Sequence, residues 1–126
     1  MFTHVMVGSS DIARSQAFYD ATFVALGAPA GQPFGTRVFY ANGDGPGFGV
    51  GVPANGEPAC SANGGTIGFR APDKDSVDAW YAAGIANGGS DEGAPGPRPG
   101  VPGNAYGAYL RDPDGNKLCV FCQLPA

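Results

Sequence analysis

Charge is scarce in this chain, and positive charge is the scarcer kind. Of its 126 residues only 14% are charged, with 7 Lys and Arg against 11 Asp and Glu, which gives a formal net charge of −4. The chain therefore lacks a basic stripe that would attract a phosphate backbone or an anionic membrane. We expect neither nucleic acid nor a membrane among its partners.

Other familiar signatures are missing too. No apolar run approaches the roughly 20 residues needed to span a bilayer, and Met1–His4 begins a strand pattern rather than a charged and apolar leader, so we expect a cytoplasmic protein. Three cysteines are an odd number for a disulfide framework, and we expect reduced thiols. The chain shows no phosphate loop, Ser-His-Asp set or paired-cysteine zinc motif.

Glycine and proline are abundant, with 22 and 12 copies, yet the hydrophobic fraction is still 43%. Because the apolar residues recur periodically, we interpret the glycines as boundaries between short strands rather than as a sign of disorder. The length suits one compact domain over residues 1–126 that can bury a core but is too short for a separate cofactor domain.

The most informative positive feature is an internal repeat. Residues 4–11, an alternating strand ending at an acidic helix start, return as residues 66–73, and each copy is followed by paired aromatics. The later parts match as well, since Gly45 falls on Gly115 and Gly49 on Cys119. We therefore predict two modules, about 1–56 and 65–126, joined by a polar linker at about 57–64, with a cleft between them as the natural functional site.

Each module is predicted to contain strands around one helix. In the first, strands 2–7, 36–41 and 48–52 surround a helix from about 11 to 26; in the second, strands 65–70, 104–111 and 117–123 surround a helix from about 73 to 86. Asp112-Pro113-Asp114-Gly115-Asn116 is the sharpest turn signal, and residues 93–103 form a predicted surface loop. The fold class is α+β, with two repeated β-α-β-β-β modules forming a curved, mixed, mostly antiparallel sheet and the helices outside.

The repeated module, the opening Thr3-His4-Val5, the middle Gly65–Phe69 and the closing Tyr109–Leu118 together resemble the vicinal oxygen chelate superfamily, which comprises glyoxalases, bleomycin resistance proteins and extradiol dioxygenases. The resemblance implies paired modules, a homodimer and cavities at the module junctions. In catalytic members it further implies a divalent metal held by His and Glu from the first and last strands of the modules.

Carried over by position, the metal-ligand positions fall on His4, Thr66, Cys119 and Gly49. Only His4 is a usual ligand, because Gly49 has no side chain and a neutral Thr66 hydroxyl is a poor donor. A pair of His4 and Cys119 with added waters is the remaining metal hypothesis; otherwise His4 is a core or cavity-lining histidine and Cys119 a small buried hydrophobic residue. We expect no cofactor, although a divalent metal stays possible.

Three functions remain open. The first is a small-molecule binding protein whose cavity lining shares an inward position on the strands: His4, Met6, Gly49, Thr66, Gly68, Tyr106, Cys119 and Phe121. The second is a metal-dependent lyase, isomerase or dioxygenase with non-standard ligands, for which Glu57, Glu92 or a partner chain would have to supply donors. The third is an interaction module whose pocket is filled by side chains. Arg37 and Arg98 are further polar candidates for holding a ligand.

Overall fold

A computed structural model describes residues 1–125, and both repeats fold as predicted modules. The first module contains β1 (His4–Gly8), α1 (Ile12–Ala25), β2 (Gln32–Phe34), β3 (Arg37–Tyr40) and β4 (Gly47–Gly51). The second contains β5 (Ile67–Arg70), α2 (Lys74–Ala86), β6 (Ser90–Pro97), β7 (Ala105–Arg111) and β8 (Lys117–Gln123). The predicted α+β class with two β-α-β-β-β units is therefore confirmed.

The strands form two four-stranded mixed sheets, in the orders β1-β4-β3-β2 and β5-β8-β7-β6. In each sheet the first and last strands of the module pair in parallel and the other pairings are antiparallel. Met6 pairs with Gly49, and Gly68 pairs with Cys119. These are the positions that the repeat aligns, so the two modules share one register. In residues 1–125 the two sheets are hydrogen-bonded separately instead of forming the one continuous sheet expected from the sequence.

Two strands were not predicted from the residues. β2 is a three-residue edge strand, too short to show an alternating pattern. β6 occupies much of the predicted loop 93–103, although its pairing with β7 shifts register between Asp91 and Gly93 and again between Gly93 and Gly96. Proline is tolerated in such a strand because β6 lies at the edge of its sheet, where an absent N–H breaks no ladder.

Both helices begin at the predicted acidic residues. Asp11 accepts a hydrogen bond from the backbone N–H of Arg14, and Asp73 accepts one from Ser76, so each carboxylate satisfies an otherwise unpaired donor of the first turn. Gly27 and Gly88 follow the two helices with positive φ angles of 83° and 96°. No helix within residues 1–125 combines the length and apolar character needed to cross a membrane.

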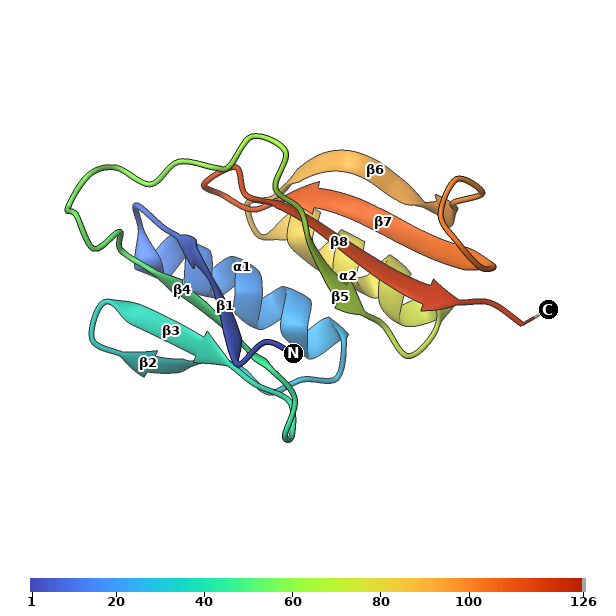
Figure 1. Cartoon of the computed structure of the whole chain (residues 1–126), viewed down its shortest axis with the longest axis horizontal. Coiled ribbons are helices and arrows are strands. Elements are labelled where there is room, and N and C mark those ends of the chain that lie inside the picture. Colours follow the sequence, from blue (N-terminus) through green and yellow to red (C-terminus); the bar gives the residue numbers. More distant parts are fainter. Residues whose placement is uncertain (126) are drawn as a thin grey trace.

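A single hydrophobic core joins the modules. The helices pack against each other and cover one face of both sheets, while the opposite face of each sheet is open (Figure 1). Phe69 of β5 lies 5.0 Å from Phe23 of α1 and 5.4 Å from Phe48 of β4, measured between ring centroids. Aromatic packing of this kind removes a large apolar area from water, so neither module is expected to be stable alone.

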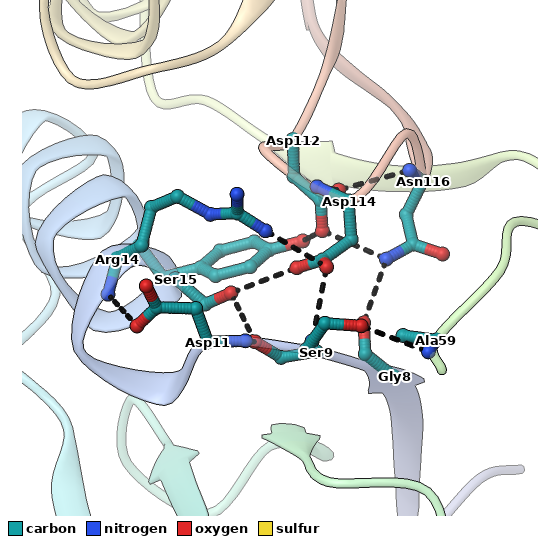
Figure 2. A network of polar contacts seen from close by, with 11 residues as sticks. Gly8, Ser9, Asp11, Arg14, Ser15, Ala59, Asp112, Asp114 and Asn116 are labelled. Atoms are coloured by element: carbon teal, nitrogen blue, oxygen red, sulfur yellow. Dashed lines mark hydrogen bonds and ion pairs between the residues drawn. The ribbon is translucent and has the colours of Figure 1, made fainter. Parts of the chain in front are cut away.

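The predicted turn at residues 112–116 connects the two modules through polar contacts (Figure 2). The Asp112 side chain is buried and accepts hydrogen bonds from the backbone N–H groups of Asp114 and Asn116, at 2.9 Å each. Its other oxygen accepts the hydroxyl of Tyr19, on α1, at 2.6 Å. Burial and the neighbouring Asp112 carboxylate together raise the pKa of Tyr19 well above its ordinary value, so the hydroxyl stays a donor.

Two more residues of this turn reach the first module. Asp114 accepts hydrogen bonds from the backbone N–H of Ser10, the guanidinium of Arg14 and the hydroxyl of Ser15, each at 3.0 Å. A carboxylate at the start of α1 also complements the positive end of the helix dipole. Asn116 donates its side-chain amide to the carbonyl oxygen of Gly8 at the end of β1. We call the side chains of Asp112, Asp114 and Asn116 the inter-module latch.

Replacing Tyr19 by phenylalanine tests the latch. The substitution keeps the buried ring but leaves one Asp112 oxygen without its 2.6 Å donor, so we expect the free energy of unfolding to fall by about 2 kcal/mol, the scale of a hydrogen bond to a buried charged group. Urea denaturation measures this loss. Tyr81→Phe is the matched control, because Tyr81 donates to Asp91 at an exposed site and its loss should cost little. Equal effects of the two variants would contradict a central role for the latch.

Candidate functional site

The open faces of the two sheets carry the chemistry available for binding. Side chains alternate along each strand, so Val7 of β1 packs into the core while His4 and Met6 lie on the open face. In β8 the buried Leu118 and Val120 face the core, which places Cys119 and its alternate neighbours on the open face. The side chains on these faces are therefore positioned by strands, although loop residues complete the hollows described below.

A hollow of about 490 Å³ lies on the open face of the first sheet. The lining combines two polar groups with apolar surface: His4, Met6, Val7, Gly8, Arg37, Phe39, Gly51, Val52, Pro53 and Ala54. Met6 and Val52 remain 40% and 44% exposed, although both are large hydrophobic residues. The hollow therefore offers some apolar surface to solvent.

Glycines let the lining side chains lie flat on β4. A Cβ atom on Gly49 would lie 2.9 Å from Cε of Met6 and 3.0 Å from the ring of Phe39, and its contact with Sδ of Met6 would be shorter still. A Cβ on Gly51 would lie 2.9 Å from Cγ of Arg37. Gly49 is thus the floor beneath two apolar side chains.

His4 is an exposed residue at the start of β1, not a buried core histidine. Its Nδ1 atom lies 2.9 Å from the hydroxyl oxygen of Thr3, which orients the ring. Within residues 1–125 no hydrogen bond engages Nε2, which is left to meet a ligand. The other side chains that line its hollow include a guanidinium but neither a carboxylate nor a thiol.

Gly68, Cys119 and Phe121 lie together on the open face of the second sheet. A Cβ on Gly68 would lie 3.1 Å from Sγ of Cys119, and the Phe121 ring stands edge-on to Tyr109 with centroids 5.8 Å apart. Burial raises the pKa of the Cys119 thiol, and the charge of Lys117 offsets this only in part. A raised pKa lowers the thiolate fraction at neutral pH, so Cys119 is a poor nucleophile.

Two of the predicted lining residues lie elsewhere. Thr66 borders a different hollow at the end of the second sheet, with Arg111 and Lys117. The cavity-lining prediction for Tyr106 is wrong, because its ring belongs to the buried core on the helix side and its hydroxyl donates to Asp78 of α2 at 2.6 Å. The seven other predicted lining residues divide between the two open faces and this end of the second sheet instead of meeting in one cavity.

Sequence reasoning missed Phe39 and Tyr109 as open-face residues. Phe39 alternates with the buried Val38 and Tyr40 on β3, and Tyr109 alternates with the buried Ala108 and Leu110 on β7. Alternation along these strands is the signal that would have found them. Each of these two aromatic residues has a cation on its own face. Arg37 lies on β3 with Phe39, and Nζ of Lys117 lies 5.4 Å from the Tyr109 ring centroid.

A divalent metal, which the resemblance left possible, does not fit these residues. His4 and Cys119 lie on different sheets, and His4 shares its hollow with the positively charged Arg37. Glu92, one of the possible substitute donors, is held by Arg111 at 2.6 Å, and Glu57 is exposed in the linker. Among residues 1–125 no three His, Cys, Asp or Glu side chains come together in a way that would hold an ion. A divalent cation needs several converging donors, and these residues do not supply them.

Two mixed sheets of β-α-β-β-β units with helices on one face are the arrangement expected for the vicinal oxygen chelate class of folds. The Glyoxalase/Bleomycin resistance protein/Dioxygenase superfamily model matches residues 1–120. The chain belongs to that superfamily.

Solved structures agree with this assignment. A glyoxalase/bleomycin resistance protein from Albidiferax ferrireducens T118 is 47% identical, with 99% of each chain covered and a TM-score of 0.90. A lactoylglutathione lyase from Agrobacterium tumefaciens is 27% identical over 96% of this chain and 92% of its own, with a TM-score of 0.63. A family enzyme from Burkholderia phytofirmans PsJN, 20% identical over 97% and 98% of the two chains with a TM-score of 0.72, shows the same fold. No curated protein matches the chain.

Proposed function

We propose that this protein binds a small organic molecule in the hollow on the open face of β1, β4 and β3, without a complete metal site. The observation that carries the proposal is the lining itself, where His4 and Arg37 stand beside Met6 and Phe39 around about 490 Å³. Ligand pockets of about 300–1,000 Å³ with apolar walls and a few polar anchors are typical of small-molecule sites.

Each part of the hollow has a separate task in this proposal. Phe39 and Met6 present flat apolar surface above Gly49, which suits a planar or aromatic body. The Arg37 guanidinium offers a fork of donors to a carboxylate or carbonyl oxygen, and Nε2 of His4 offers one further hydrogen bond. Binding without chemistry at a metal would correspond to sequestration of the ligand.

A ligand screen tests this function. We expect at least one small aromatic compound with an acceptor group to raise the melting temperature of the protein, and we expect Arg37→Gln to weaken its binding about tenfold, because a charge-assisted hydrogen bond is removed. A thermal-shift assay measures the melting temperature, and calorimetric titration measures the affinity. Lys74→Gln, on α2 and away from the hollow, is a control that changes the net charge equally. The proposal fails if no compound stabilises the wild type, or if the control weakens binding as much as Arg37→Gln.

Metal content separates binding from the alternative, a metal-dependent lyase, isomerase or dioxygenase. Protein purified without a chelator or a metal-affinity tag should contain well below one equivalent of any divalent metal, because the donors around His4 are incomplete. Elemental analysis measures the content, and added nickel, zinc or manganese should leave the melting temperature unchanged. One equivalent of metal that is released by His4→Ala would instead support the metalloenzyme.

We also propose a homodimer that covers the open faces. Phe34 on the edge strand β2 is 71% exposed and pairs with Arg37, so it extends the apolar face that contains Met6 and Phe39. Burying such a patch between two copies would remove it from water. The cytoplasm remains the proposed location, which suits the three free cysteines of residues 1–125.

Sedimentation velocity tests the dimer. The wild type should sediment as a dimer at micromolar concentration, and Phe34→Asp should sediment as a monomer, because removing the added carboxylate from water opposes association even with Arg37 on the neighbouring strand. Val24→Ser is the control: Val24 is 57% exposed but lies on α1, on the helix side. A monomeric wild type would refute the dimer, and a dimer that survives Phe34→Asp would move its interface elsewhere.

A further inference from the structure

A second hollow, of about 410 Å³, lies at the end of the second sheet next to the latch. Its wall is formed on one side by the segment 61–66 and on the other by Arg111, at the end of β7, and Lys117, at the start of β8. It shares no residue with the hollow that contains His4. The segment is polar and small, with the hydroxyls of Ser61 and Thr66 at its two ends.

The two cations in this hollow differ in how they are held. Arg111 donates Nε to Glu92 at 2.6 Å and one terminal nitrogen to the carbonyl oxygen of Gly115 at 2.8 Å, which fixes its guanidinium and leaves the other terminal nitrogen free. Residues 1–125 contain three ion pairs, Arg14–Asp114, Lys74–Asp78 and Arg111–Glu92. Lys117 takes part in none of them, so its ammonium group has no carboxylate partner there.

Several cations lie on or beside the open face of the second sheet, although Glu92 pairs with one of them, Arg111. Arg70 alternates with core-facing neighbours on β5, and the Arg98 guanidinium lies 5.7 Å from the Tyr109 ring centroid. With Arg111 and Lys117, four of the seven Lys and Arg residues therefore lie on or beside this face, in a chain of net charge −4. Such local positive charge raises the concentration of anions near the hollow.

We propose that this hollow binds the oxyanionic group of a small planar molecule, a carboxylate or a phosphate. Lys117 supplies a point charge and Arg111 a fixed N–H donor, and both form their strongest hydrogen bonds to ionised oxygen. The Thr66 hydroxyl completes a polar wall opposite them. Tyr109 does not line the hollow, but Nζ of Lys117 lies over its ring, 5.4 Å from the centroid. A ligand that draws the ammonium toward its oxyanion would uncover this ring as a contact for its planar body.

Three probes test the proposal by calorimetric titration at constant ionic strength: inorganic phosphate, benzoate and phenyl phosphate. Saturable binding of phenyl phosphate that is tighter than that of inorganic phosphate is expected. Lys117→Gln should weaken it about tenfold, the scale of one charge-assisted hydrogen bond, and Lys117→Arg should retain most of the affinity. Lys74→Gln, which removes the only other lysine, should bind like the wild type.

The same titrations locate the site. The titrations are repeated in the Arg37→Gln background, which removes the guanidinium of the first hollow, so that binding lost on Lys117→Gln reports on the second hollow alone and the two proposals fail separately. Circular dichroism checks that each variant is folded, and Thr66→Val, which keeps both cations, provides a second test if Lys117→Gln is unstable; it should also weaken binding. No saturable binding of any probe, or equal weakening by Lys74→Gln, would overturn the site. Equal affinity for phenyl phosphate and inorganic phosphate would refute the proposed contribution of a planar body to binding.

Discussion

The structure depends on one buried carboxylate. Asp112 accepts donors from its own turn and from Tyr19 in the other module, so it fixes the β7–β8 turn and its position on α1 together. A buried charge is costly unless its hydrogen bonds are made, and here they are supplied by both modules. Separation of the modules would leave Asp112 one donor short and expose the shared aromatic core. The relative placement of the two sheets, and of both hollows, therefore rests on this contact.

The repeat makes the latch one-sided. Asn42, Asp44 and Pro46 occupy the positions of the first module that correspond to the latch residues, and all three are exposed. The turn of the second module thus contacts the first module, whereas the corresponding turn of the first module makes no equivalent contact through these residues. The linings of the two hollows differ as well. The hollow on the first sheet is mainly apolar with two polar side chains, and the hollow at the end of the second sheet is polar with two cations.

Much of the fold follows from local patterns, whereas the site does not. Alternation and turn residues predicted eight of the elements and the aligned register of Met6 and Gly68, because these depend on neighbours in the chain. The latch joins residues as far apart as Ser10 and Asp114, so the turn was predicted but its partner was not. Tyr106 was assigned to the wrong face because the residues of β7 before Arg111 are all uncharged, so only alternation counted back from Arg111, together with packing against α2, distinguishes the faces. The strand β6 was missed because its prolines argue against a strand in the sequence, and only its position at the edge of the sheet makes them acceptable.

The same residues that argue against a metal also create the apolar hollow. A donor side chain at position 49 would begin with a Cβ 2.9 Å from Cε of Met6 and 3.0 Å from the Phe39 ring, so it would have to displace both. With glycine there, these side chains instead lie across β4 and form a surface for a ligand body. On the second sheet the raised pKa of Cys119 keeps a neutral, weakly polar thiol at the corresponding position. The lack of donors and the apolar surface therefore both follow from Gly49 and Cys119, which is the physical argument that supports the proposed ligand binding over metal catalysis.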